Sequence, residues 1–134
     1  MNRRTINNIF LGCCVLLCLG ACSGSKSPAI YIDGDTYKFG KVKAGQEVVF
    51  TFFISNPGTA DLVLKDLYIS CECVVVKEYD RVIKPGTRGK VYGVIKTEGL
   101  SGDILRAIKL KTNIPDTEPI LKMEGTVLPP GTDS

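Results

Sequence analysis

The sequence of 134 residues contains no histidine and no tryptophan. The absence of histidine excludes the Ser-His-Asp arrangement, an imidazole general base and nearly all zinc enzyme sites. The 17 Lys and Arg residues are nearly balanced by 14 Asp and Glu residues, and no basic cluster is present. The chain therefore lacks the positive field that attracts nucleic acid. We expect a protein that is not an enzyme, carries no cofactor and does not bind nucleic acid.

Long apolar runs are scarce, and the one near the start is short. Residues 9–19 form an apolar run that follows Arg3 and Arg4. A transmembrane helix needs about 20 apolar residues, so this run is too short to be one. A basic start, an apolar stretch and then small residues are typical of a secretory signal peptide. We predict that residues 1–21 are such a peptide, exported by the general route because Thr5-Ile6-Asn7 fits the twin-arginine signal poorly.

The end of this segment is more specific than an ordinary cleavage site. Leu19-Gly20-Ala21-Cys22 resembles the bacterial lipobox, in which small residues precede a cysteine that receives lipid on its sulfur. We predict a lipoprotein anchored to a membrane of the bacterial cell envelope through lipid, such as palmitate, on Cys22. The alternative is an ordinary secreted protein with an unrelated Cys22. Residues 22–29 are then the lipidated cysteine and a short polar linker that reaches at most about 25 Å. No acidic run follows Cys22, which favours the periplasmic side.

The remainder of the chain contains no convincing helical pattern. In Glu47–Ser55, Val48, Phe50, Phe52 and Ile54 alternate with the other residues, and this period of two predicts a strand with these four in the core. Val49 and Phe53 fall on the opposite face. Cover by a loop or tail is favoured there over a binding patch, and both remain open.

Other short strands follow at regular intervals, separated by turns rich in Gly, Pro, Asn and Asp. Leu62 and Leu64 are in phase with each other, but Leu67 is not, which predicts a bulge near Lys65-Asp66. Further alternation occurs at Val91 to Ile95, at Ile104, Ile108 and Leu110, and at Leu121, Met123, Gly125 and Val127. The chain left after removal of the signal peptide has about 110 residues, which suits one domain. We predict an all-β fold, an immunoglobulin-like antiparallel β-sandwich of about seven strands, over residues 30–128, with a flexible tail over residues 129–134.

Several of these turns and strands carry a shared motif. The matching residues are Phe39-Gly40, Gly45, Asn56 and Gly58, Leu62, Leu64, Leu67, Ser70-Cys71-Glu72-Cys73, Pro85-Gly86, Asn113 and Gly125-Thr126-Val127. They resemble a bacterial domain-of-unknown-function family with an immunoglobulin-like fold and a Ser-Cys-x-Cys signature. The resemblance covers about residues 37–127, and its most specific part is the cysteine signature.

That family is similar to the major sperm protein, PapD-like and hydin-like modules, which act mainly as binding and scaffolding domains. The resemblance therefore implies a binding or scaffold module near the membrane, with an unidentified envelope protein as its partner. The chain departs from the family pattern at two positions. Glu72 stands where the family usually has glycine, and Val74 stands where it usually has threonine.

Cys71 and Cys73 are the candidate chemical site. Cys13, Cys14 and Cys18 leave with the signal peptide and Cys22 is lipidated, so these two remain as thiols. They are either core side chains on one strand face, a disulfide, a redox or metal site, or a pair that bonds to another chain. Regular strand geometry places their Cα atoms about 6.6–6.8 Å apart, which disfavours a bridge without a local bend.

A metal at this pair has limited chemistry available. Two thiolates do not complete a four-ligand zinc site within one chain. Cu(I) accepts two soft ligands, with Met123 as a third if it lies close, and a dimer would pool four thiolates. We favour a non-enzymatic lipid-anchored envelope protein, with a thiol redox or Cu(I)-binding protein that uses Cys71 and Cys73 as the alternative.

Overall fold

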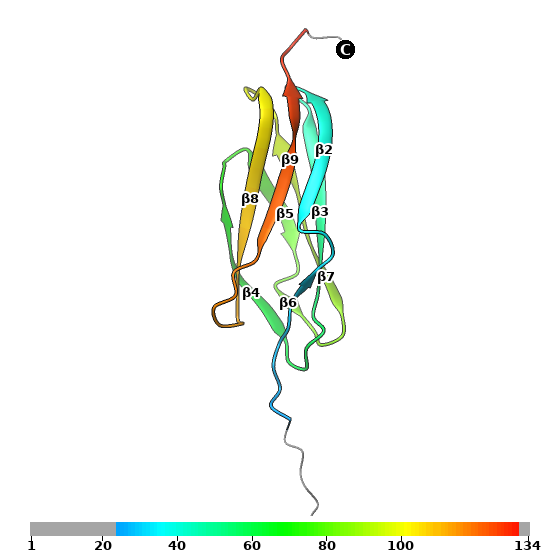
Figure 1. Ribbon diagram of the computed structural model, residues 1–134, viewed down its shortest axis with the longest axis vertical. Helices are drawn as coiled ribbons and strands as arrows, with labels where there is room; N and C mark the ends of the chain where they lie inside the picture. Colours follow the sequence, from blue (N-terminus) through cyan, green and yellow to red (C-terminus); the bar gives the residue numbers. More distant parts are fainter. Residues whose placement is uncertain (1–23, 132–134) are drawn as a thin grey trace, which may run out of the picture.

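The computed structural model describes residues 24–131, so the predicted signal peptide, Cys22 and the last three residues lie outside the described residues. The described part is built from strands, turns and loops in two packed sheets (Figure 1). The strands are β1 (Tyr31–Ile32), β2 (Thr36–Lys43), β3 (Glu47–Ser55), β4 (Leu62–Ile69), β5 (Val74–Tyr79), β6 (Val82–Ile83), β7 (Arg88–Lys96), β8 (Gly102–Thr112) and β9 (Ile120–Leu128). Within residues 24–131, no helix is long and apolar enough to cross a membrane.

The two sheets have four and five strands. One has the order β1-β3-β7-β5, and the other has the order β2-β9-β8-β4-β6. Figure 1 shows β2, β9 and β8 in front and β3, β7 and β5 behind them. The all-β sandwich predicted from the sequence is confirmed. It contains seven longer strands and, in addition, the two-residue strands β1 and β6.

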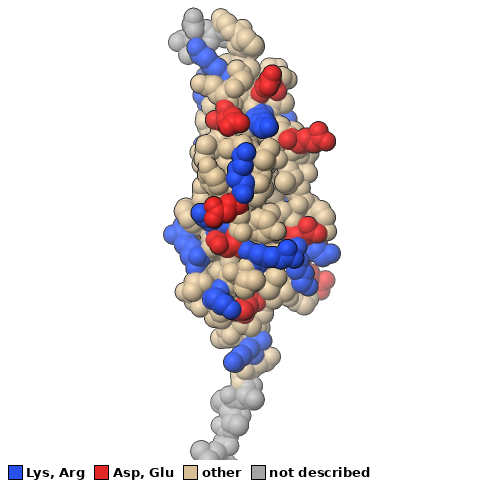
Figure 2. Space-filling model, turned by 180° about the vertical axis from the view of Figure 1, so that it is seen from behind, with Lys and Arg blue, Asp and Glu red and all other residues tan. Residues whose placement is uncertain are grey.

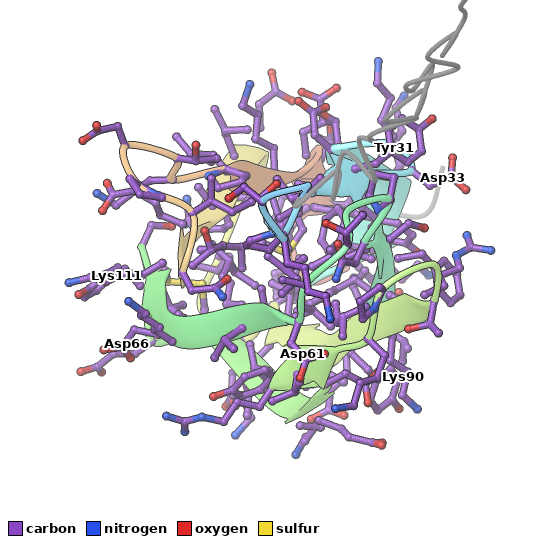
Figure 3. The ribbon with its side chains drawn as sticks, turned by 90° about the horizontal axis from the view of Figure 1, so that it is seen from below. Tyr31, Asp33, Asp61, Asp66, Lys90 and Lys111 are labelled. Carbon is purple, nitrogen blue, oxygen red and sulfur yellow. A yellow bond between two sulfur atoms is a disulfide. The ribbon has the colours of Figure 1, made fainter. Side chains whose placement is uncertain are left out.

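The core lies between the sheets and follows the predicted alternation. Phe50 and Ile54 of β3 are fully buried, as are Ile108 of β8 and Leu121 of β9. Full burial of one such side chain contributes about 1.5–3 kcal/mol. Most charged residues lie on the outer faces, and Figure 3 shows the side chains of Asp66 and Lys111 pointing outward on the opposite side from Asp33.

A bulge interrupts β4 where the sequence predicted it. The pairing of β4 with β8 shifts register between Leu64 and Asp66. The shift returns Leu67 to the inner face, where it packs against the core beside its partner Leu110. The predicted bulge near Lys65-Asp66 is therefore confirmed.

One strand pair departs from the antiparallel expectation. β2 pairs with β9 in parallel, with a register shift between Lys38 and Gly40. The reason is the path of the chain, because β1 pairs with β3 in the first sheet and the chain then crosses to the edge of the second. The first two strands, β1 and β2, therefore belong to different sheets.

The Phe39-Gly40 pair and Gly125 of the sequence motif meet across this parallel pairing. A Cβ atom on Gly125 would overlap the ring of Phe39 and lie 2.6 Å from the carbonyl oxygen of Gly40. The ring thus occupies the space that a side chain at position 125 would need. The motif residues at these distant positions form one packing unit.

Candidate functional site

The cysteine pair lies in a turn, and the structure corrects the prediction that it belongs to a strand. β4 ends at Ile69 and β5 begins at Val74, with Cys71 and Cys73 in the turn between them. The turn brings the two Cα atoms to 5.2 Å, and the two cysteines form a disulfide. The strand spacing that disfavoured a bridge does not apply, because the local bend it required is this turn.

The structure accommodates both departures from the family pattern, Glu72 in this turn and Val74 at the start of β5. Among residues 24–131, Asp116 is the single non-glycine residue with positive φ, so Glu72 does not adopt the conformation that requires glycine. Its side chain is exposed to solvent. Val74 is 3 % exposed and opens β5 opposite Ile95, so an apolar side chain fills the core at that position.

The two sulfur atoms have different surroundings. Cys71 Sγ accepts a hydrogen bond from the backbone N–H of Cys73 at 3.1 Å. Cys73 packs against the core, and its Sγ lies 3.3 Å from Nε of Arg106, which donates to it. The turn is also tied to β8, since Ser70 N–H donates to the carbonyl oxygen of Ala107 at 3.0 Å and Ser70 Oγ accepts from Ala107 N–H at 2.9 Å.

Sequence reasoning missed Arg106, although a signal was present. Residue 106 occupies the same alternating phase as Ile104, Ile108 and Leu110, so a cation stands where β8 otherwise places apolar side chains. Its partner across the ladder is Met123 of β9. A charged residue in the apolar phase of a strand is uncommon without a partner, and here the partner is a sulfur from a turn 33 residues away.

The geometry bears on the Cu(I) alternative. Met123 is fully buried in the core. In the disulfide state Cys71 and Cys73 have no thiolate to offer a metal, and the Arg106 cation disfavours a second cation beside Cys73. In the described part of the chain, no group of three or more His, Cys, Asp and Glu side chains is arranged to hold a metal ion.

The aspartates labelled in Figure 3 do not cluster. Figure 3 shows Asp33, Asp61 and Asp66 on three different parts of the sandwich. The pKa of Glu118 is lowered because its carboxylate accepts a hydrogen bond from Lys109 at 2.8 Å, and the pKa of Lys109 is raised by the same contact. Both side chains are about half exposed to solvent, so this contact is a surface ion pair.

The outer face of β3 remains partly apolar. Val49 is 50 % exposed and Phe53 is 41 % exposed, so the favoured expectation that a loop or tail covers this face is wrong for the described residues. Arg88 is the group that lies over Phe53, with its guanidinium carbon 4.0 Å from the ring centroid, and it pairs with Asp33 at 2.9 Å. A cation on a neighbouring strand shields the ring in place of a loop.

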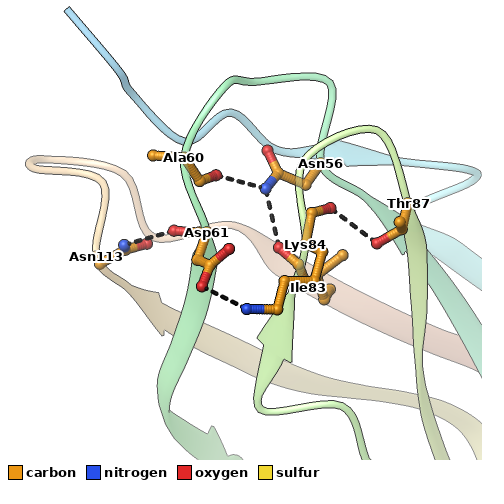
Figure 4. A network of polar contacts seen from close by, with 7 residues as sticks. All are labelled: Asn56, Ala60, Asp61, Ile83, Lys84, Thr87 and Asn113. Atoms are coloured by element: carbon orange, nitrogen blue, oxygen red, sulfur yellow. Dashed lines mark hydrogen bonds and ion pairs between the residues drawn. The ribbon is translucent and has the colours of Figure 1, made fainter.

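A buried asparagine joins the N-terminal segment to the sandwich. Asn56 is fully buried, and its Nδ2 donates to the carbonyl oxygens of Ala60 at 2.7 Å and Ile83 at 2.9 Å (Figure 4). Its Oδ1 accepts from the backbone N–H groups of Ala29 at 3.2 Å and Gly58 at 3.0 Å. The side chain therefore holds three segments of chain at one corner.

The segment before β1 is further fixed at this corner. The carbonyl oxygen of Ser27 accepts from the N–H groups of Thr59 at 2.8 Å and Ala60 at 3.2 Å. A Cβ atom on Gly58 would come within 2.5 Å of the backbone of Ala29. Only glycine permits this approach, so the Asn56 and Gly58 motif explains why residues 27–29 pack against the domain.

The chain is similar to known proteins in both sequence and fold. Residues 30–127 match a family described as a protein of unknown function, DUF1573. No protein of curated function matches the chain. A Porphyromonas gingivalis W83 protein of unknown function is similar, with a TM-score of 0.66 and 18 % identity over 81 % of this chain. This chain spans 50 % of that protein's length.

Two further solved structures share the sandwich. The ASH/PapD-like domain 7 of human CEP192 has a TM-score of 0.56 and 13 % identity, over 75 % of this chain and 85 % of that one. The Vibrio cholerae VesB protease has a TM-score of 0.58 and 12 % identity, over 73 % of this chain and 31 % of that one. At these identities the similarity shows the immunoglobulin-like, PapD-like fold alone.

Proposed function

The chain belongs to the DUF1573 family, whose match covers residues 30–127, and we propose that it is a non-enzymatic, lipid-anchored module of the bacterial cell envelope. In this proposal the sandwich is a binding or scaffold domain held close to a membrane, on its periplasmic side. The PapD-like fold is consistent with a binding module. Lipidation of Cys22 rests on the sequence signal, since Cys22 lies outside the described residues.

The attachment of residues 27–29 to the Asn56 corner is the observation that carries this proposal. Ser27 and Ala29 are hydrogen-bonded to the domain, so five residue steps separate Cys22 from the folded part. Five steps reach at most about 18 Å, at roughly 3.3–3.6 Å per residue. A lipid on Cys22 would therefore hold this corner near the membrane and leave the opposite end of the sandwich facing outward.

Three of the four open edges favour contact through a face of the sandwich over strand addition. Strands β2 and β5, and β4 beyond its short pairing with β6, each contain a register shift, whereas β3 beyond its short pairing with β1 contains none. Bulges and charged side chains at edges hinder pairing with another chain's strand. The outer face of β3, β7 and β5 carries Val49, Val94 and Val75 in one cross-strand row. Val94 in the middle of the row is 4 % exposed, so Val49 and the half-buried Val75 supply its accessible apolar surface.

We take another envelope protein as the occupant of this face. Figure 2 shows the molecule from behind the view of Figure 1, with basic and acidic side chains interspersed among uncharged surface. An anionic lipid surface attracts clustered Lys and Arg, whereas mixed charges around an apolar row are suited to a protein partner.

Lipid attachment is tested by growing cells with labelled palmitate and isolating the full-length protein. Label in the wild type and none in Cys22→Ala is the expected result, with the variant released from the membrane fraction. Cys18→Ala is the matched control and should keep both label and membrane association. Unlabelled, soluble wild type would contradict the anchor.

The binding face is tested by placing a photo-crosslinking residue at position 49 or, on the other sheet, at position 105, where Leu105 is 59 % exposed. We expect one discrete protein adduct from position 49 in intact cells and none from position 105. The captured protein, once purified, should bind the wild type and lose affinity for Val49→Glu. Equal adducts from both faces, unchanged binding by Val49→Glu, or measurable turnover of a substrate other than thiol–disulfide exchange by the purified protein would reject the proposal.

A further inference from the structure

The Cys71–Cys73 disulfide lies at an accessible place in the sandwich. Both cysteines are partly exposed, and the turn follows the end of β4. β4 begins beside Ile83, near the Asn56 corner, and its eight residues carry the chain roughly 25 Å along the sandwich. Figure 1 accordingly shows the turn between β4 and β5 in the half of the molecule away from the N-terminal segment. The described N-terminal residues therefore leave this turn accessible to a soluble or membrane-bound thiol partner.

The bond contributes little as a structural staple. The two cysteines are separated by two positions in the sequence. The loop-closure entropy that a disulfide removes from the unfolded chain grows with the number of residues enclosed. A bond that encloses one residue restrains almost none of the unfolded ensemble, so stabilisation of the fold does not account for it.

Arg106 makes the two sulfurs chemically unequal. Its Nε contacts Cys73 Sγ at 3.3 Å, and its Nη1 donates to the carbonyl oxygen of Leu105 at 2.9 Å. Among the described residues it forms no ion pair with a carboxylate. A guanidinium is permanently charged, so its field at Cys73 is not cancelled by a neighbouring anion. Cys71 accepts only a neutral backbone N–H.

From this arrangement we propose that Cys71–Cys73 is an exchangeable disulfide, in which Cys71 is the sulfur attacked by a thiol partner and Cys73 is the leaving thiolate stabilised by Arg106. The position of the cation decides the direction of the exchange. A thiol leaves faster when its thiolate is more stable, and a nearby cation stabilises a thiolate.

The reaction with a dithiol reductant balances in two steps. The first thiolate of the reductant attacks Cys71 Sγ, the Cys71–Cys73 bond breaks, and its electron pair remains on Cys73 Sγ beside Arg106. The second thiolate of the reductant then attacks the reductant sulfur of the mixed disulfide, and Cys71 leaves as a thiolate that takes a proton. The reductant becomes a disulfide, and the pair becomes one thiol and one thiolate. In the reverse sequence the reduced pair reduces a partner disulfide to a dithiol and the Cys71–Cys73 bond re-forms, so the same site accepts or donates two electrons.

The experiment uses the full-length protein, purified in detergent and kept folded. Trypsin releases residues 66–77 as one peptide that holds both cysteines and no other, so each readout is specific to this site. Dithiothreitol is the dithiol probe for the rate of reduction, and glutathione is the monothiol that traps the mixed disulfide. Fragmentation of the peptide assigns the glutathione to Cys71 or Cys73.

We expect the native wild type to be reduced by dithiothreitol and to carry glutathione on Cys71. Arg106→Gln should slow reduction about 3- to 10-fold and distribute glutathione over both cysteines. In the reduced wild type, alkylation of Cys73 should begin at lower pH than alkylation of Cys71, and Arg106→Gln should remove this difference. Arg88→Gln removes a cation from β7, far from the turn, and is the matched control.

Arg106→Lys keeps the charge and should retain most of the rate. If Arg106→Gln fails to fold, this second variant still tests the role of the charge. The position of glutathione in the wild type tests the direction of attack without any variant. Reduction that occurs only in denaturant, glutathione on Cys73 in the wild type, or equal rates and pH profiles for folded wild type and Arg106→Gln would overturn the proposal.

Discussion

Asn56 and Ile83 are linked by a hydrogen bond of 2.9 Å from the asparagine Nδ2 to the isoleucine carbonyl oxygen, across 27 residues of sequence. Asn56 is fully buried, and its side chain is hydrogen-bonded to four backbone groups, of which those of Ala60 and Ile83 are drawn in Figure 4. Because a buried amide must be paired, this side chain both requires and fixes the arrangement of the loops around it. The N-terminal segment is one of those partners.

Replacing Asn56 with alanine should therefore lower the free energy of unfolding by about 2–4 kcal/mol, because four buried or part-buried backbone groups lose their partner together. Denaturant unfolding of the purified protein measures the change. Asn113→Ala is the control. Asn113 makes two such bonds, to Asp61 and Val63, in a more exposed place. A smaller loss for Asn56→Ala than for Asn113→Ala would contradict the role of Asn56.

The contact between Phe39 and Gly125 predicts a specific pairwise effect. Gly125→Ala should destabilise the protein by about 1–3 kcal/mol, because the added methyl group overlaps the Phe39 ring and the Gly40 carbonyl oxygen. Combining it with Phe39→Leu should restore part of the loss, giving a coupling energy in a double-mutant cycle. Gly24→Ala, which meets no atom within 4 Å, should be neutral. Strict additivity of the two changes would refute the contact.

Val48 and Val49 are adjacent valines on opposite faces of β3, with 7 % and 50 % of their surfaces exposed. Val48→Ala should lower the free energy of unfolding by about 1–3 kcal/mol, since it empties part of the core. Val49→Ala should cost less than about 0.5 kcal/mol, because that side chain already contacts solvent. Thermal unfolding of both variants checks the register, and an equal loss for the two would show that the face assignment is wrong.

The Lys109–Glu118 pair predicts a change in titration. The pKa of Glu118 is lowered chiefly by the hydrogen bond from Lys109. Ionised Glu118 therefore favours the folded state above the ordinary glutamate pKa, and this contribution is lost as the pH falls through the lowered value. Lys109→Met should return the pKa of Glu118 to its usual range, as measured by nuclear magnetic resonance of the carboxyl carbon. An unchanged midpoint would exclude the contact in solution.

Much of the sandwich followed from the sequence because strand periodicity is a local property. The alternation in Glu47–Ser55 predicted which side chains of β3 are buried, and the phase change after Leu64 predicted the bulge in β4. The parallel pairing of β2 with β9 did not follow, since it depends on where the chain crosses between sheets. Local alternation has the same appearance in parallel and antiparallel edge strands.

The sequence by itself determined the alternating core, the turn glycines, the absence of histidine chemistry and the pair of cysteines near the middle of the domain. Only the tertiary structure decided what that pair does in the fold. The end of β4 turns the two cysteines out of strand geometry, and the pairing of β4 with β8 brings Arg106 to Cys73 from 33 residues away. A side chain's neighbours across a sheet depend on strand order and register, and these are set by packing of the whole chain rather than by the residues beside it.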